Sequence, residues 1–380
     1  MKFDKIQIET TTLCNLECGY CHGRNLPVID IAEELFEKMA GLAKEYVLYG
    51  YGEPLLYPNL IRKAEILGGD IVISTNGMVE IDRHTVELAD RIGVSVDVDD
   101  RYRKGLIVDS ALKKFELLGE KGLAQIVVTK SNVHKLPEFF EKVAQYGSGL
   151  LATNVVAPNP EIYNEAVYFE GSKRNVEFVM DLDEKILVEA IRDCSRGGGR
   201  ALTLYRSLLS EVYSQGYSIN LISIFEFRDR IRRSIEAESV FERIEEIARD
   251  NGVELIAPKF FGDSKSRECP YKNSIFVRAD GAVSSCMSFA YAHREYVNAH
   301  WKRIAGYEVG NLNVQDVDEI KENLAEFERL REDMENFPWC ADCPYVRGCW
   351  FAERDLDCYA NQPSCSECLY SSGIAKCLLG

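Results

Sequence analysis

The fold and the chemistry of this chain turn on one segment, Cys14-Asn15-Leu16-Glu17-Cys18-Gly19-Tyr20-Cys21, which follows the first apolar run. Its C-x3-C-x2-C spacing lets three thiolates surround one face of a metal centre. A structural zinc site needs a fourth protein ligand, and His22 is a poor candidate because it adjoins Cys21. Three thiolates without a fourth therefore indicate an iron–sulfur cluster with one open iron; a zinc knuckle completed from elsewhere is the alternative.

Composition describes the rest of the chain as a globular protein. The 380 residues carry 45 basic and 61 acidic side chains, a net charge of −16, which disfavours a nucleic-acid partner. Thirteen cysteines with a long cysteine-poor middle do not form a disulfide scaffold. No signal-peptide region or membrane span is found, so we expect a cytoplasmic protein without a membrane partner.

From residue 3 to about 157, short β-branched runs alternate with amphipathic segments. The expected strands are Phe3–Thr10, Tyr46–Tyr49, Ile71–Thr75, Gly93–Asp97, Ala124–Thr129 and Leu150–Val156. The expected helices cover 30–45, 58–67, 82–92, 109–121 and 135–146, with Asp30 and Asp82 as N-caps. Such alternation predicts parallel strands, in an open sheet or a partial barrel. In either fold the chemistry lies at the carboxyl ends of the strands.

Unusual residues follow four of these strands in turn. The first leads into Cys14, the second into Gly50-Tyr51-Gly52-Glu53-Pro54, the third into Ser74-Thr75-Asn76-Gly77 and the fourth into an aspartate-rich loop that begins at Asp97. A single loop of this kind would more often be an ordinary turn. Four of them at one edge of a sheet indicate a functional site.

These motifs, in this order, resemble the radical S-adenosylmethionine (radical SAM) superfamily over residues 3–157. The resemblance implies that Cys14, Cys18 and Cys21 hold a [4Fe-4S] cluster whose open iron binds S-adenosylmethionine (SAM). YGYGEP is similar to the family's GGEP motif, with Tyr51 in place of the first glycine. The residues that the resemblance assigns to SAM are Tyr20, Gly52, Glu53, Pro54, Ser74, Asn76, Ser95, Asp97 and Val155. A catalytic acid or base cannot be assigned.

The middle of the chain reads as helical, over 181–194, 201–214 and 222–248, with Cys194 as a buried apolar residue. A strand at Val253–Pro258 follows. Beyond it we expect a hairpin of Ser274–Val277 and Ala282–Ser285, and a helix over 316–335. His293, His300 and Trp301 could line a substrate cleft or pack in a core, so they are given no role.

The C-terminal cysteines resemble the SPASM extension of radical SAM enzymes, through Cys269-x11-Gly281-x4-Cys286 and Cys340-x2-Cys343-x5-Cys349. The pattern departs where Glu353 takes the place of a cysteine. The resemblance implies two auxiliary [4Fe-4S] clusters, one with Cys340, Cys343 and Cys349 and the other with Cys269 and Cys286. The division of Cys358, Cys365, Cys368 and Cys377 stays open. A zinc ribbon built on the two C-x2-C pairs is the alternative.

The sequence thus predicts an α/β fold, a partial (β/α)6 TIM-like barrel followed by a cysteine-rich iron–sulfur domain. The expected divisions are a barrel at 1–160, a helical continuation at 161–258 and a SPASM-like domain at 259–380. The resemblance implies radical modification of a peptide or protein, with a ferredoxin or flavodoxin-type electron donor. Maturation of a small cofactor or tetrapyrrole, and a non-enzymatic zinc-stapled binding module, are the alternatives.

Overall fold

The structure is a computed structural model, and it describes residues 2–98, 108–180, 182–183 and 185–378. Within these ranges no helix combines the length and the apolar character that crossing a membrane requires.

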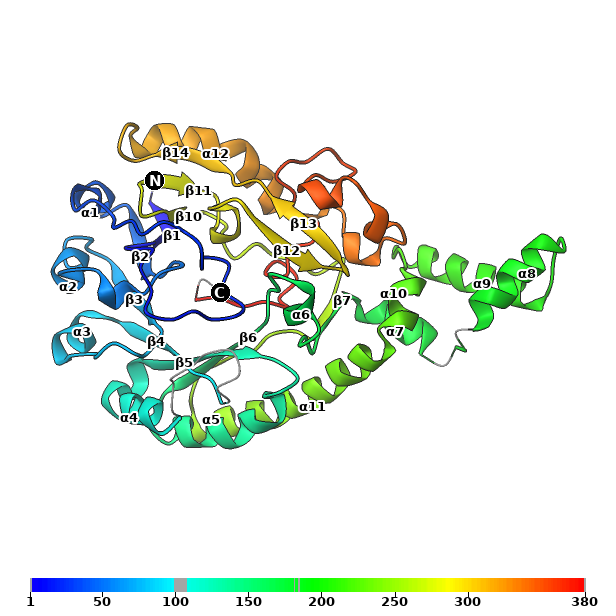
Figure 1. The fold of residues 1–380 in the computed structure, drawn as a ribbon, viewed down its shortest axis with the longest axis horizontal. Helices are drawn as coiled ribbons and strands as arrows, with labels where there is room; N and C mark the ends of the chain where they lie inside the picture. Colours follow the sequence, from blue (N-terminus) through cyan, green and yellow to red (C-terminus); the bar gives the residue numbers. More distant parts are fainter. Residues whose placement is uncertain (1, 99–107, 181, 184, 379–380) are drawn as a thin grey trace.

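Six parallel strands in consecutive order form the wall of a partial barrel (Figure 1). They are β1 (Phe3–Ile8), β2 (Ala43–Leu48), β3 (Asp70–Thr75), β4 (Arg91–Ser95), β5 (Gly122–Val128) and β6 (Gly149–Asn154). The helices between them cover the outside and are α1 (Glu34–Met39), α2 (Leu60–Ala64), α3 (Arg83–Leu88), α4 (Val108–Leu118) and α5 (Leu136–Ala144). Buried strand residues such as Ile8 and Ile73 share one core with the helical Phe36 and Phe140. This arrangement confirms the predicted partial barrel.

All six predicted strands are present, but two predicted helices run too far. Residues 43–45 and 91–92 belong to strands, because hydrogen bonding to the neighbouring strand overrides the local helical pattern. Asp82 caps α3 as expected, accepting a 2.7 Å hydrogen bond from the Thr85 amide. The prediction for Asp30 is wrong: it forms an isolated bridge with Thr11, and α1 begins after Glu33.

The sheet extends beyond the barrel at both edges. β8 (Leu255–Ile256) lies beside β6, while β10 (Ser274–Val277), β11 (Ala282–Ser284) and β14 (Glu308–Asn311) continue outward from β1. β10 and β11 form the predicted hairpin, and Gly281 takes a left-handed φ of 81° in its turn. The three-part domain division stays a prediction, although the pairing of β1 with β10 crosses the expected boundary at 258 and that of β6 with β8 crosses the one at 160.

The middle of the chain is helical and partly stands away from the barrel. Its elements are α6 (Pro160–Tyr163), β7 (Phe169–Ser172), α7 (Lys173–Val179), α8 (Lys185–Ser195), α9 (Arg200–Ser214), α10 (Leu221–Glu226), α11 (Arg228–Asn251) and β9 (Phe261–Gly262). The expected helix over 222–248 is two helices that meet at Phe227. Figure 1 shows α8 and α9 projecting from the body. Cys194 on α8 is exposed, so its predicted burial is wrong, because these two helices pack mainly on each other.

The C-terminal part adds the hairpin of β12 (His293–Val297) and β13 (His300–Ile304), then α12 (Val317–Glu332) close to the expected 316–335. Short 3-10 turns follow at Met334–Asn336, Cys340–Asp342, Val346–Gly348 and Ala352–Arg354. The last described residues run back to the centre of the barrel (Figure 1). There the Lys376 amide donates to Thr153 Oγ1 at 2.8 Å, and Asn154 Nδ2 donates to the Ile374 carbonyl at 3.1 Å.

Candidate active site

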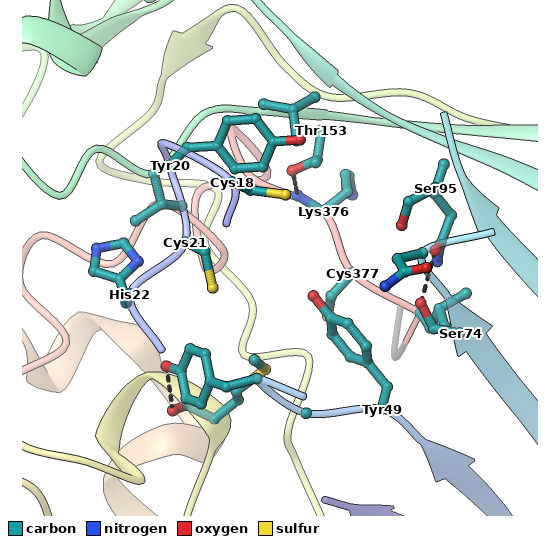
Figure 2. A pocket seen from close by; sticks show the side chains of 18 of the residues that line it. Cys18, Tyr20, Cys21, His22, Tyr49, Ser74, Ser95, Thr153, Lys376 and Cys377 are labelled. Carbon is teal, nitrogen blue, oxygen red and sulfur yellow. Dashed lines mark hydrogen bonds between the residues drawn. The ribbon is translucent and has the colours of Figure 1, made fainter. Parts of the chain in front are cut away.

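The cysteine loop spans the residues between β1 and α1 and lies over the carboxyl ends of the strands. Thr12 fixes its base, since the Thr12 hydroxyl donates to the Pro27 carbonyl at 2.7 Å and accepts from the Ile29 amide at 2.8 Å. Cys14, Cys18 and Cys21 all line a cavity of about 270 Å³. Figure 2 shows the sulfur of Cys21 pointing into this cavity. The structure therefore brings the three predicted cluster ligands together.

The loop after β2 is pressed against the cysteine loop. The Glu53 amide donates to the Leu13 carbonyl at 2.8 Å, and a Cβ added to Gly52 would lie 2.1 Å from the Thr11 carbonyl oxygen. Only glycine therefore allows this approach. The buried Glu53 carboxylate accepts from Thr75 Oγ1 at 2.7 Å and from the Asn76 amide at 2.6 Å, which ties the loops after β2 and β3 together.

Most of the predicted SAM contacts line this first cavity. They are Tyr20, Gly52, Glu53, Ser74, Asn76, Ser95 and Val155. Pro54 and Asp97 are buried but do not line it. Asn76 Nδ2 lies 3.7 Å from the Cys14 sulfur and donates to Asn15 Oδ1 at 2.6 Å, so it holds the start of the cysteine loop. Their role toward SAM stays a prediction.

Several lining residues were not predicted from the sequence. Gln125 on β5 accepts a 2.7 Å hydrogen bond from Ser74 Oγ, and Thr153 on β6 anchors the C-terminal segment (Figure 2). A polar residue inside the apolar run Leu123–Val128 was a usable signal for Gln125. No sequence signal indicated that Lys376 and Cys377 line the cavity, because their position depends on where the end of the chain folds back.

Burial sets the protonation of the groups around the cysteine loop. It raises the pKa of the Cys21 thiol, so the thiolate needs a cation such as cluster iron beside it. It lowers the pKa of His22 to about 4. Burial also opposes the charge of Glu295, but the contact with His293 and the nearby positive charges hold the pKa of this carboxyl at about 2.

Four further cysteines meet in a second cavity of about 50 Å³: Cys269, Cys286, Cys365 and Cys368. Burial raises the pKa of Cys286 to about 12. The buried guanidinium of Arg331 offsets the negative charge of thiolates in this cavity, and its Nε donates to Cys269 Sγ at 3.2 Å. The SPASM pattern gave only Cys269 and Cys286 for this cluster. The structure places Cys365 and Cys368 beside them.

Cys340, Cys343 and Cys349 lie in or directly after the 3-10 turns Cys340–Asp342 and Val346–Gly348 and form a third group. The Cys343 amide donates to the Cys340 carbonyl at 2.9 Å. Burial, the Asp357 charge and the thiolates of Cys343 and Cys349 raise the pKa of Cys358. Cys377, predicted as a metal ligand, lies apart from this group and lines the first cavity.

The spacing of the cysteine sulfurs helps to decide whether the cysteines bind zinc or iron–sulfur clusters. A tetrahedral zinc ion, with zinc–sulfur bonds of about 2.3 Å, draws its sulfurs close together. In the part of the chain that the structure describes, no three cysteine sulfurs lie within 4.8 Å of one another. Wider spacing suits a cluster in which each thiolate binds its own iron. Of the two C-x2-C pairs of the zinc-ribbon alternative, Cys365 and Cys368 line the second cavity together with Cys269 and Cys286.

Comparison with known proteins agrees with this geometry. The model of the radical SAM superfamily matches residues 8–134, and that of the SPASM iron–sulfur cluster-binding domain matches residues 269–344. A relative from Pyrococcus furiosus, a tungsten-containing aldehyde ferredoxin oxidoreductase cofactor-modifying protein, is 24% identical over 98% of this chain and 96% of its own. A GTP 3′,8-cyclase from Chlorobaculum tepidum is 30% identical over 35% of this chain and 44% of its own.

Among solved structures, SuiB from Streptococcus suis bound to S-adenosylmethionine has a TM-score of 0.49 at 14% identity, covering 92% of this chain and 73% of that one. The regions of this chain that match the two families include the cysteine loop and the first C-terminal cysteines. The cofactors are therefore SAM, a [4Fe-4S] cluster and auxiliary iron–sulfur clusters. This chain therefore carries a radical SAM domain at residues 8–134 and a SPASM iron–sulfur domain at residues 269–344, and it is an enzyme.

Proposed function

We propose that this enzyme modifies a small organic cofactor or cofactor precursor by radical chemistry. The observation that carries the proposal is the relative that spans nearly the whole chain, whose name describes a cofactor-modifying protein. When bound, the reduced cluster and SAM supply a 5′-deoxyadenosyl radical that abstracts hydrogen from a substrate C–H bond. The cluster cysteines and the predicted SAM contacts line the same cavity of about 270 Å³, so a substrate would have to bind beside them.

Residues from several parts of the chain form the walls of the chamber. Tyr49, Tyr271 and Tyr370 line it, and burial raises the pKa of all three, so they stay neutral. The segment Ile374–Leu378 closes one side, held to β6 by the hydrogen bonds of Thr153 and Asn154. Walls of this kind limit the contact of a reactive radical with water and other groups.

A peptide or protein side chain, the substrate expected from the sequence, is the second candidate. It is favoured by the SPASM match, because the resemblance to SPASM enzymes is what led us to expect a peptide or protein substrate from the sequence. A peptide would have to enter past the cysteine loop or the C-terminal segment, because both lie at the chamber.

Anaerobic reconstitution tests the core of the proposal. The holoenzyme should contain about twelve iron atoms per chain and form 5′-deoxyadenosine from SAM and a low-potential reductant. Changing Cys14, Cys18 and Cys21 together to Ala should abolish this product and leave about eight iron atoms. Zinc in place of iron, or 5′-deoxyadenosine from the triple variant, would overturn the assignment.

The substrate class is tested with cell extract separated by size. We expect the small-molecule fraction to increase 5′-deoxyadenosine formation by the holoenzyme, and a new product to appear in that fraction by mass spectrometry. Stimulation by the peptide fraction alone would support the second candidate instead. The triple cysteine variant is the control for both fractions.

A further inference from the structure

Three possible metal ligands that belong to none of the cysteine groups meet at the wall of the first cavity. His293 and Glu295 lie two residues apart on β12, so their side chains emerge on the same face. His22 follows the last cysteine of the loop after β1. One ligand atom from each of the three lies within 4.8 Å of the others, and all three residues line the cavity.

The hydrogen bonds of His293 identify which ring nitrogen carries its proton. Nδ1 lies 2.9 Å from the Tyr291 carbonyl oxygen, which can only accept, so Nδ1 donates. In a neutral ring this leaves Nε2 as an acceptor, and it lies 3.0 Å from Glu295 Oε1, which is also an acceptor. Either a proton on Nε2 or a metal ion between the two atoms must resolve this contact. A backbone carbonyl on Nδ1 is the usual partner of a histidine that binds metal through Nε2.

His22 distinguishes these two possibilities. Its Nε2 is buried and makes no hydrogen bond with the described residues, although its ring lies against that of His293 with centroids 4.9 Å apart. A buried polar atom without a partner costs free energy. A proton on His293 would satisfy Glu295 and leave His22 unsatisfied, whereas a metal ion would satisfy all three residues.

A second histidine of the same hairpin, His300, shows the difference. His300 has the same arrangement, with Nδ1 3.0 Å from the Trp301 carbonyl and Nε2 2.8 Å from Glu367. Asn298 donates to the same Glu367 oxygen at 2.6 Å, and among the described residues no third ligand joins this pair. It is therefore a hydrogen-bonded pair that joins the hairpin to the C-terminal segment. Among the described residues, the His293–Glu295 pair has a third ligand and the His300–Glu367 pair has none.

We propose that His22, His293 and Glu295 form a site for one divalent transition-metal ion, with Zn²⁺ as the reference ion. Two imidazoles and one carboxylate are a common ligand set for Zn²⁺ and Fe²⁺, and they leave coordination positions open. Those positions face the cavity, where an oxygen, nitrogen or sulfur donor of the substrate can occupy them. The nearby Lys302 does not replace the ion, because its ammonium group pairs with Asp355 at 3.0 Å.

The role of the ion as a substrate anchor rests on the proposed function, but the site does not. Metal binding is therefore measured without SAM or substrate, so failure of the proposed function leaves this test unaffected. The iron–sulfur-loaded holoenzyme is treated with chelator, desalted anaerobically and titrated with Zn²⁺. Zinc is counted per chain by elemental analysis, and its ligands are identified by zinc X-ray absorption.

We expect about one zinc per chain with nitrogen and oxygen neighbours only. Glu295→Gln and His293→Ala, compared with wild type at equal iron content, should weaken zinc binding by more than about 100-fold. His84→Ala, which removes a histidine that faces Glu65 on the surface, should leave it unchanged. No bound zinc, zinc bound through sulfur, or full binding by Glu295→Gln and His293→Ala would overturn the site.

Discussion

Replacing Gly52 by Ala tests whether the contact between the two loops positions the SAM site. The added Cβ would lie 2.1 Å from the Thr11 carbonyl oxygen and 2.8 Å from that of Leu13, whereas ordinary contacts begin near 3.4 Å. Both neighbours are backbone atoms that no side-chain rotation can move away. One loop must therefore shift by about 1 Å relative to the other, and a displacement of that size costs about 100-fold in rate.

The assay is the rate of 5′-deoxyadenosine formation by the reconstituted enzyme, with iron measured on the same samples. We expect Gly52→Ala to lose about 100-fold in rate and to keep its iron, because the cysteines themselves are unchanged. The matched control is Gly252→Ala. Gly252 ends α11 with a left-handed φ of 65° and has open space around its Cα, so Ala there costs about 1 kcal/mol of stability far from the site.

Two outcomes would refute the reasoning. If Gly52→Ala retained more than half of the wild-type rate, the loops would not need this approach. If Gly252→Ala lost as much activity as Gly52→Ala, the loss would follow general stability and not the geometry of the site.

Two further changes test the cysteine groups and the middle of the chain. Changing Cys365 and Cys368 together to Ala should remove about four iron atoms per chain, whereas Cys194→Ser should remove none; equal iron in both variants would contradict the grouping. Arg230→Ala should lower the free energy of unfolding by about 3–5 kcal/mol, because the guanidinium lies 3.9 Å from a buried carboxylate that would be left unpaired. The exposed Arg232→Ala should cost less than about 1 kcal/mol, and equal urea midpoints for the two variants would show that the buried pair is not needed.

The barrel and its site edge were predictable because their signals are local. Each strand has its own β-branched run, and the polar loops follow those runs directly, so parallel pairing alone brings them to one edge. The ends of the helices were less predictable. Asp90, for example, continues a helical pattern, but its amide donates to the Ile71 carbonyl at 2.8 Å and so begins the approach to β4.

The parts that could not be predicted depend on contacts between distant segments. β10 pairs with β1 although about 270 residues separate them, and no local pattern encodes this choice of neighbour. The same holds for the cysteines. Their spacing allows several groupings, and only the folding of the C-terminal segment brings Cys365 and Cys368 to Cys269 and Cys286.

The two cavities are separated by one layer of side chains. The hairpin of β12 and β13 contributes to this layer through Glu295 and so lines both cavities. Tyr271, Ser288, Glu295 and Tyr370 line the first cavity and also the second, where the group of Cys269 lies. A charge on Glu295 therefore acts on the substrate chamber and on these cysteines at the same time. On the far side the positive charge of Arg331 stabilises the thiolates, and on the near side a cation bound by Glu295 would offset its carboxylate. An ion at His22, His293 and Glu295 should thus make the cluster in the second cavity easier to reduce, since added positive charge favours the reduced state.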